Sequence, residues 1–285
     1  MILESTFRKY TSLFKQQGMP DAADEARVLI CHVLKVDSAG FFAMFDKHLT
    51  DAEQSALSAL AERRVSGEPA AYIVGHREFY GIDLFVDNRV LIPRPETELL
   101  VEEVLEYSRG KNAAPLYIAD VGTGSGAIAI ALALILTNAS IFAIDISAAA
   151  LEVAWRNVCR YGLQGRISLL KGNLLSLLPR PVDVVVANLP YIAEGDLQGL
   201  PVEVSCYEPD IALNGGGDGA TVINRLLRQV RGKVNPGGIV LLEIGSGQQS
   251  KIFKMVKRVL PDSEIVLRED LAGIKRVVKI IVPCL

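Results

Sequence analysis

The run Asn188-Leu189-Pro190-Tyr191 combines an amide, a rigid proline and an aromatic ring at one point of the chain. It follows an apolar stretch, residues 182–187, that is typical of a buried parallel strand. In open α/β sheets, ligands bind outside the carboxyl ends of the strands. The Asn188 amide offers one acceptor and two donors, which suit a planar –NH2 group such as a side-chain amide or an exocyclic base amine. Tyr191 could then lie against the flat face of that group. The alternative is a simple turn, with Asn188 as cap and Pro190 as breaker.

A glycine-rich loop, Asp120-Val121-Gly122-Thr123-Gly124-Ser125-Gly126, joins a predicted strand to a predicted helix. The glycines permit a tight turn and a close approach of backbone to ligand, and N–H groups at a helix start favour electronegative ligand atoms. Gly122, Gly124 and Ala127 also satisfy a dinucleotide-binding pattern. The loop alone therefore fits a methyl-donor cofactor and a nicotinamide cofactor equally well, with a structural turn as a third alternative.

Two carboxylates near this loop bear on the choice of ligand. Asp145 ends the second predicted strand, where an acid can accept both ribose hydroxyls of an adenosine cofactor; capping a helix that begins near Ser147 is the alternative. Asp120 suits a ligand with an ammonium group, such as the methionine part of S-adenosylmethionine, and would disfavour a pyrophosphate. Its alternative role is to bond loop amides at the strand end.

A weaker signal, Asn173-Leu174, follows the third predicted strand. The Asn173 amide could bind the adenine edge and Leu174 could pack on the ring, although an Asn in this position is most often part of a turn.

Composition excludes several other function classes. The net charge of −3 argues against broad binding of nucleic acid. The cysteines and histidines are dispersed, so neither a disulfide framework nor a metal site is predicted, and no Ser-His-Asp arrangement is evident; the four cysteines are Cys31, Cys159, Cys206 and Cys284. Residues 1–13 lack a signal-peptide core, and the apolar run 127–136 is too short to cross a bilayer. We expect a soluble, cytoplasmic protein.

The segments that contain and connect these residues alternate between strand and helix. The pattern predicts a doubly wound, mostly parallel seven-stranded sheet of the α/β class. Its strands are expected at 116–121, 140–145, 166–170, 182–188, 238–244, 264–268 and 276–282. Its helices are expected at 125–136, 148–161, 219–234 and 248–259.

The first part of the chain has a different residue pattern. Residues 1–64 show helical periodicity, with Asp21 as one cap and Thr50-Asp51 opening a later helix, which predicts a small bundle for docking or recognition. Residues 72–92 predict two short strands of a β-hairpin linker, with Asp87-Asn88 as a turn signal. Pro93-Arg94-Pro95 stiffens the chain before a helix that runs from Glu96 to about Ser108.

With these residues in hand, the chain resembles the bacterial release-factor glutamine N5-methyltransferases over nearly its whole length. The tetrapeptide 188–191 is similar to the Asn-Pro-Pro-Tyr signature of that family, and 120–126 to its cofactor loop. Segments 90–98 (Val-Leu-Ile-Pro-Arg-Pro-Glu-Thr-Glu) and 207–219 are similar to longer family segments. The matching positions before and within these segments are Pro69, Tyr72, Gly75, Glu78, Phe79, Gly81, Tyr207, Glu208, Pro209, Ala212, Leu213, Gly216, Asp218 and Gly219.

This resemblance implies a Rossmann-like class I methyltransferase that uses S-adenosylmethionine. The implied substrate is the glutamine of the Gly-Gly-Gln tripeptide in class I peptide chain release factors, so that the protein modifies translation termination by protein methylation. The implied organisation is a helical substrate-recognition domain (1–70), a hairpin linker (71–95) and a catalytic domain (96–285). We further expect a monomer with no stable nucleic-acid binding and no membrane partner.

The resemblance also implies site residues. The catalytic set is Asn188, Leu189, Pro190 and Tyr191; the cofactor set is Asp120, Gly122, Thr123, Gly124, Ser125, Gly126, Asp145, Asn173, Leu174 and Asn188, with no metal. Two positions depart from the family pattern: Leu189 replaces the usual first proline, and Asn173 stands where Asp is common.

A mechanism follows as a hypothesis. The Asn188 oxygen would accept one N–H of the substrate amide and the carbonyl of residue 189 the other, aligning its nitrogen with the sulfonium methyl. Methylation of a ribosomal-protein glutamine, adenine-N6 methylation of nucleic acid, an NAD-dependent oxidoreductase and a noncatalytic binding protein stay open as alternatives.

Overall fold

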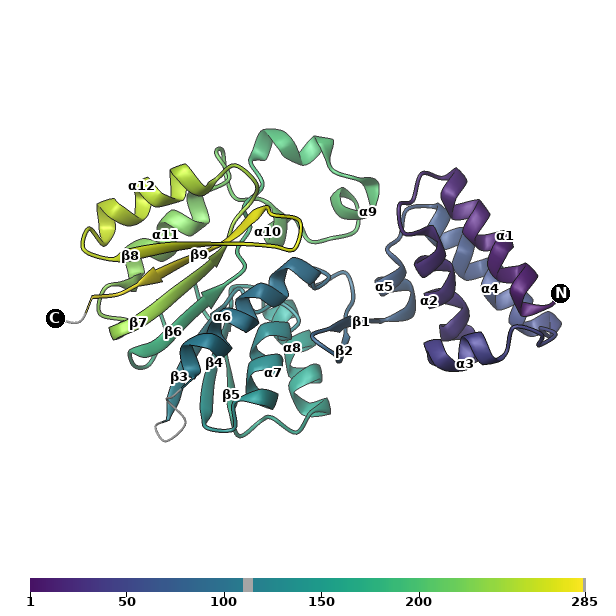
Figure 1. The fold of residues 1–285 in the computed structure, drawn as a ribbon, viewed down its shortest axis with the longest axis horizontal. Helices are drawn as coiled ribbons and strands as arrows, with labels where there is room; N and C mark the ends of the chain where they lie inside the picture. The colour runs from purple at the N-terminus through teal and green to yellow at the C-terminus, as the bar shows by residue number, and fades with distance from the viewer. Residues whose placement is uncertain (110–114, 284–285) are drawn as a thin grey trace. The chain divides into compact units, whose positions relative to one another are not determined.

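Residues 1–109 and 115–283 are described by a computed structural model, and they divide into two units with separate cores (Figure 1). The first comprises Met1–His76 with Pro201–Tyr207, and the second comprises Arg77–Leu200 with Glu208–Leu285. The chain therefore leaves the second unit once to add a short segment to the first. Cys284 lies outside the described residues.

The first unit is helical, as the periodicity predicts. Its helices are α1 (Leu3–Gln16), α2 (Ala22–Leu34), α3 (Ser38–Ala43), α4 (Asp51–Val65), α5 (Ala70–Val74) and, from the added segment, α9 (Val202–Ser205). Thr50 starts α4 through a capping box with Glu53. Asp21 lies at the N-cap position of α2, but its side chain makes no capping hydrogen bond.

One buried arginine ties the added segment to this helical unit. Arg64 on α4 is only 2% exposed and forms ion pairs with Glu25 of α2 and Glu203 of α9. Because a buried guanidinium is costly without partners, these two carboxylates hold the segment 201–207 against α4.

A two-stranded hairpin opens the second unit, but its turn is not where the sequence predicts it. The strands are β1 (His76–Phe79) and β2 (Ile82–Phe85), joined at Tyr80 and Gly81. Both turn residues have positive φ, 52° and 72°, as two-residue hairpin turns of the favoured type require. The prediction that Asp87-Asn88 forms the hairpin turn is therefore wrong: those residues follow the hairpin, and no strand is found at 86–94.

The predicted α/β sheet is confirmed. Seven strands lie in the order β5-β4-β3-β6-β7-β9-β8, and only β9 runs antiparallel to its neighbours. The strands are β3 (Leu116–Val121), β4 (Ala139–Asp145), β5 (Ile167–Lys171), β6 (Val182–Ala187), β7 (Val234–Glu243), β8 (Glu264–Glu269) and β9 (Lys275–Ile281). β7 begins earlier than the predicted Gly238, because a bulge carries its pairing with β6 back to Val234.

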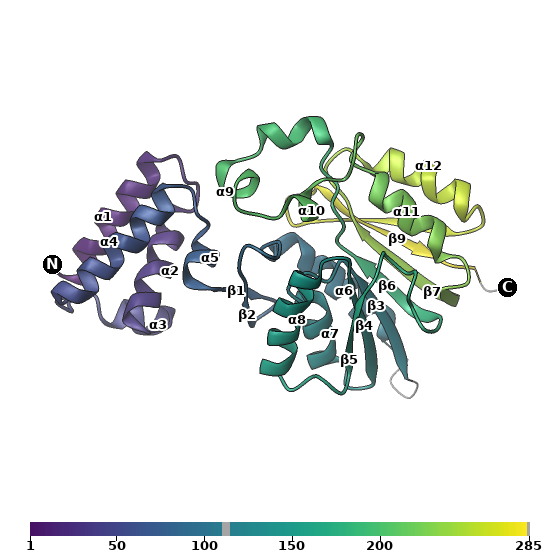
Figure 2. The same ribbon diagram turned by 180° about the vertical axis from the view of Figure 1, so that it is seen from behind.

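Helices cover both faces of this sheet (Figure 1 and Figure 2). One core cluster joins α6 (Glu98–Ser108), α7 (Ala127–Ile135) and α8 (Ala148–Arg160) to one face, and a second joins α11 (Thr221–Val230) and α12 (Gln249–Val259) to the other. The neighbours Ile118 and Ala119 of β3 belong to different clusters, as the alternation of side chains along a strand requires. Shorter elements are η1 (Pro95–Thr97), η2 (Glu194–Gly199) and α10 (Asp210–Leu213).

α7 is the most apolar of these helices, and residues 127–133 are all buried. None of the helices in the described part of the chain is long and apolar enough to cross a membrane.

The strand order reverses at β3, and this reversal positions the site. β3 pairs with β4 on one side and β6 on the other, with Val121 opposite both Ile144 and Ala187. The carboxyl ends of three parallel strands therefore lie together, and the crevice outside such a reversal is where doubly wound sheets bind ligands.

Candidate active site

The glycine-rich loop leaves β3 and folds over the end of β4. The backbone N–H groups of Gly122 and Thr123 both donate to the carbonyl of Ile144, at 2.8 and 3.0 Å. Gly122, Gly124 and Gly126 have φ of 78°, 55° and 83°, in the left-handed region that favours glycine. The loop conformation therefore depends on these residues, and Gly126 places the start of α7 directly after it.

The loop also lies against the tetrapeptide after β6. A methyl group added at Gly122 would lie 3.1 Å from Leu189 Cδ2 and 3.2 Å from the backbone oxygen of Asn188. Glycine at 122 therefore lets the two motifs pack against each other. The 5% exposed Leu189 side chain belongs to the core on the α11 and α12 face of the sheet.

The two carboxylates predicted to bind ligand have different surroundings. Asp145 accepts hydrogen bonds from the backbone N–H groups of Gly124 and Ser147, both at 2.9 Å. Ser147, and not Asp145, caps α8 through Ala150 N–H. Burial raises the pKa of Asp145, whereas its bonds to backbone N–H groups oppose that rise.

Asp120 is fully buried under the loop. Its Oδ2 accepts from the hydroxyl of Thr123 at 2.6 Å and from Ala129 N–H at 3.2 Å, while Oδ1 has no partner in the described structure. Burial raises the pKa of Asp120 to about 7, with the nearby Asp145 charge adding to the rise. A buried carboxylate oxygen without a donor is costly, and a bound cationic group would compensate for it.

A cavity of about 580 Å³ lies where these segments meet. Ten of the predicted residues line it: Gly122, Thr123, Gly124, Ser125, Asp145, Asn173, Leu174, Asn188, Leu189 and Pro190. Three others, Asp120, Gly126 and Tyr191, do not line it and instead support residues that do. The fold thus brings all the predicted segments to one crevice.

The two residues predicted from the sequence to contact adenine, Asn173 and Leu174, both line the cavity. Asn173 Oδ1 accepts from Arg225 on α11 at 3.0 Å. Leu174 has a φ of 56°, which costs a residue with a Cβ roughly 1–2 kcal/mol. Such strain in a cavity wall is typical of functional sites.

Asn188 is held by a buried polar cluster. Its Nδ2 donates to Thr97 Oγ1 at 3.0 Å, and Thr97 donates to Glu243 Oε2 at 2.7 Å. Tyr191 donates its hydroxyl to the other Glu243 oxygen at 3.3 Å. Burial raises the pKa of Glu243, while the hydrogen bonds from Thr97 and Tyr191 oppose that rise.

An ion pair joins two of the family-like segments at the cavity wall. One nitrogen of Arg94 donates to both oxygens of Glu208, each at 2.8 Å, and the Glu208 side chain is 1% exposed. Arg94 lines the cavity, so Glu208 positions a cation there.

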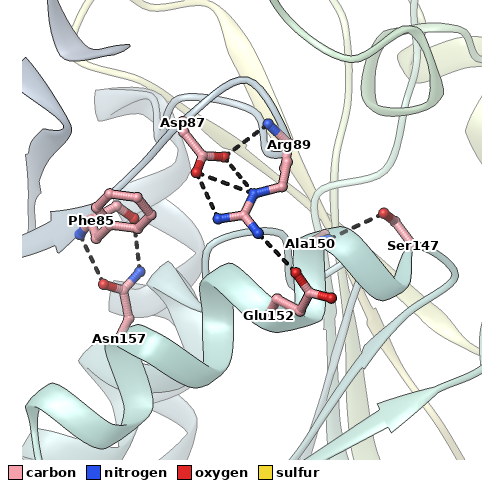
Figure 3. A network of polar contacts seen from close by, with 7 residues as sticks. All are labelled: Phe85, Asp87, Arg89, Ser147, Ala150, Glu152 and Asn157. Carbon is pink, nitrogen blue, oxygen red and sulfur yellow. Dashed lines mark hydrogen bonds and ion pairs between the residues drawn. The ribbon is translucent and has the colours of Figure 1, made fainter. Parts of the chain in front are cut away.

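A second set of contacts fixes the segment after the hairpin to α8 (Figure 3). The fully buried Asn157 accepts from Phe85 N–H and donates to the carbonyls of Phe85 and Ser125. Arg89 pairs with Asp87 and, through its other nitrogen, with Glu152. Because Ser125 belongs to the glycine-rich loop, Asn157 connects that loop to β2.

Comparison with known proteins agrees with this geometry. A model of the PrmC N-terminal domain matches residues 6–75, and a model of ribosomal protein L11 methyltransferase (PrmA) matches residues 95–194. The release factor glutamine methyltransferase of Bradyrhizobium diazoefficiens is 36% identical over 97% of this chain and 93% of its own length. That of Geobacter sulfurreducens is 38% identical over 92% of this chain and 90% of its own.

This chain belongs to the release factor glutamine methyltransferase family. The methyltransferase fold recurs in a solved methyltransferase from Pyrococcus furiosus, which is 16% identical, covers 79% of this chain and 99% of its own, and has a TM-score of 0.52. The predicted family, fold class and enzyme class are thus confirmed, and family and fold together imply S-adenosylmethionine as methyl donor.

Sequence reasoning about this methyltransferase missed three polar residues of the site. Thr97 was noted only within a family-like segment, and Glu243 and Asn157 were given no role. A signal for Glu243 exists, since it is a lone acid in the apolar run 239–244, as Asp120 is in 116–121. Thr97 and Asn157 give no comparable signal, because their importance depends on contacts to distant residues.

Proposed function

We propose that this protein transfers a methyl group from S-adenosylmethionine to the side-chain amide nitrogen (N5) of the glutamine in the Gly-Gly-Gln motif of class I peptide chain release factors. The observation that carries the proposal is the Asn188 amide, which lines the cavity beside the glycine-rich loop while its nitrogen is bound to Thr97. Its oxygen is therefore left to accept a substrate N–H. The names of the relatives supply the substrate class.

The residues around the cavity fit S-adenosylmethionine. The unpartnered oxygen of Asp120, which lies under the loop and not on the cavity wall, suits the ammonium of the methionine part through a bridging water molecule. Asp145, held by two backbone N–H groups, keeps lone pairs for the ribose hydroxyls. Leu174 offers an apolar wall for the adenine, and Asn173 an amide for its edge.

The cofactor, when bound, supplies an activated methyl group on a sulfonium. The chain itself must hold a poor nucleophile, because an amide nitrogen shares its lone pair with the carbonyl. In this proposal Asn188 Oδ1 and the backbone carbonyl of Leu189 accept the two N–H bonds of the glutamine. Alignment of this kind contributes on the order of 7–11 kcal/mol in favourable model reactions.

The other members of the tetrapeptide support this alignment. Pro190 fixes the chain direction after Leu189. Tyr191 does not line the cavity, so it would act from behind Asn188 by holding Glu243, and not by covering the amide face as the sequence suggests. The methylated nitrogen is acidic, so water can take its proton without a dedicated base.

Each part of the chain would have its own role in this reaction. The helical domain (1–70) would recognise the release factor, the linker (71–95) would connect it, and the catalytic domain (96–285) would hold both substrates. The enzyme would act as a monomer in the cytoplasm, with neither nucleic acid nor membrane as a stable partner.

Labelled methyl transfer tests this function. The protein is incubated with S-adenosylmethionine carrying a labelled methyl group and with a purified class I release factor. A parallel reaction uses a factor whose Gly-Gly-Gln glutamine is changed to alanine. We expect label in the first factor and none in the second. Equal labelling of both factors, or transfer only to a ribosomal protein or to adenine in DNA, would overturn the proposal.

A further inference from the structure

A chain of four hydrogen-bonding residues runs behind the Asn188 amide. It passes from Asn188 to Thr97 at 3.0 Å, from Thr97 to Glu243 at 2.7 Å, and from Tyr191 to Glu243 at 3.3 Å. Thr97 is 5% exposed and Glu243 is 2% exposed. Because water has little access to these two groups, their hydrogen bonds must be satisfied by each other.

The direction of each bond in this chain is set by Glu243. In its ionised form Glu243 only accepts, so Thr97 must give it its single hydroxyl hydrogen. The Thr97 oxygen then has only lone pairs for its other neighbour, and that neighbour must be a donor. Asn188 meets this requirement only with its –NH2 group turned toward Thr97. Rotating the amide by half a turn would place two acceptor oxygens against each other.

We propose that Thr97 and Glu243 are positioning residues that fix the direction of the Asn188 amide, so that Asn188 presents an acceptor, and not donors, to the substrate. This inference rests on the proposed function, because a glutamine –NH2 group needs acceptors. Tyr191 serves the same purpose, since its hydroxyl holds the second oxygen of Glu243.

Two matched pairs of variants separate this role from simple packing. Thr97→Val removes the hydroxyl at almost constant volume, whereas Thr97→Ser keeps it. Glu243→Leu removes the acceptor, whereas Glu243→Gln keeps a carbonyl oxygen that can face Thr97 while its –NH2 group faces Tyr191. We expect Thr97→Val and Glu243→Leu to lower kcat by about 10- to 100-fold with KM for S-adenosylmethionine unchanged, and the two conservative variants to stay within about threefold.

Nonadditivity shows whether Thr97 acts through Asn188. The double variant Thr97→Val, Asn188→Ala should be no slower than Asn188→Ala alone. Ser263→Ala provides a control, because Ser263 is also a buried hydroxyl residue, bonded to the carbonyl of Leu260, and does not line the cavity. It should leave kcat unchanged. Equal losses in the two Thr97 variants, or a full additional loss in the double variant, would overturn the proposal.

A readout without catalysis keeps the inference separate from the proposed function. The side-chain ¹⁵N amide signals of Asn188 are assigned by their loss in Asn188→Asp. We expect one hydrogen-bonded, slowly exchanging proton in the unchanged protein and in Thr97→Ser, and its loss in Thr97→Val and Glu243→Leu. Unchanged Asn188 signals in both Thr97→Val and Glu243→Leu would contradict the positioning role of Thr97 and Glu243, even if release factor is methylated. If the Asn188 signals change as expected but no methyl group reaches release factor, the positioning role of Thr97 and Glu243 is supported and the proposed function is contradicted.

Discussion

Asn188 can present either two donors or one acceptor to a ligand, and its neighbours decide between them. The residue that follows it is less constrained. Leu189 stands where the family resemblance implies a proline, yet the backbone carbonyl that the proposed mechanism uses is present with either side chain. What the leucine lacks is the fixed φ of proline. Its burial at 5% exposure, in contact range of Gly122, supplies a tertiary restraint in its place.

Substitutions at these two positions should therefore have unequal effects. We expect Leu189→Pro to retain activity, because it keeps the carbonyl and restores the restraint on φ. Asn188→Ala should lose most activity, about 100-fold or more in kcat, with little change in cofactor affinity. Steady-state kinetics and calorimetry on both variants check this. Full turnover by Asn188→Ala would remove the mechanism proposed for this site.

Asp120 should couple cofactor binding to a proton. Burial raises the pKa of Asp120 to about 7, so at pH 6 its carboxyl group is protonated in most molecules of the ligand-free protein. A ligand ammonium group favours the ionised form and lowers the pKa. Binding of S-adenosylhomocysteine at pH 6 should therefore release about one proton, and affinity should fall by up to tenfold per pH unit below 7.

Calorimetry at pH 6 in buffers of different ionisation enthalpy counts that proton. The comparison is Asp120→Asn, which should release about one proton fewer than the unchanged protein. Asp145, whose pKa is also raised by burial, is present in both proteins, so the difference between them reports Asp120 alone. Identical proton counts would show that Asp120 does not titrate with binding.

Between elements, a few buried polar side chains hold the loops that form the cavity wall. Asn157 on α8 bonds both the N–H and the carbonyl of Phe85 (Figure 3). It also donates to the carbonyl of Ser125. It is fully buried, and it supplies hydrogen-bond partners to backbone groups of the hairpin and of the glycine-rich loop, as a neighbouring strand would. The neighbouring ion pair between Arg89 and Glu152 is different, because the Glu152 side chain is 71% exposed.

These two contacts should contribute unequally to stability. We expect Asn157→Ala to lower the free energy of unfolding by about 2–4 kcal/mol, because buried backbone groups lose their partners. Glu152→Ala should change it by no more than about 0.5 kcal/mol, as is usual for exposed ion pairs. Urea unfolding of both variants provides the measurement. A loss at Asn157 as small as that at Glu152 would mean that solvent replaces its bonds.

For the whole molecule, the separation of cores has consequences for ligand binding. One core cluster lies wholly in the helical unit, and the two clusters on the sheet faces lie wholly in the other. All residues that line the cavity belong to the second unit. A ligand in that cavity therefore stabilises the second unit directly.

Hydrogen exchange with S-adenosylhomocysteine should reveal this division. At about 100 times its Kd, the ligand should stabilise the sheet by about 2.7 kcal/mol. Exchange of core amides in β3 and β6 should slow accordingly, while that of α1 and α2 should not change. Equal protection of α1, α2 and the sheet would show that the two units unfold together.

Local patterns in the sequence were enough to predict the α/β class, the seven strands and part of the cavity wall, because apolar runs and glycine turns are read over a few residues. Two further lining segments, 89–97 and 209–214, were not predicted as part of the site. The sequence also placed the family, since segments 90–98 and 188–191 are distinctive as written. It misplaced the hairpin turn at Asp87-Asn88. The pair Tyr80-Gly81 forms the turn, although Tyr80 takes a left-handed conformation that such a residue rarely adopts.

The direction in which the Asn188 amide faces became evident only from the folded chain. Thr97, Asn188 and Glu243 are far apart in the chain, and no local pattern links them. Strand order at β3 brings the ends of three strands together, and burial then forces each polar group to find a partner among the others. The direction of a side-chain amide is fixed by such partners, so it is a property of the assembled fold and not of the residues taken in order.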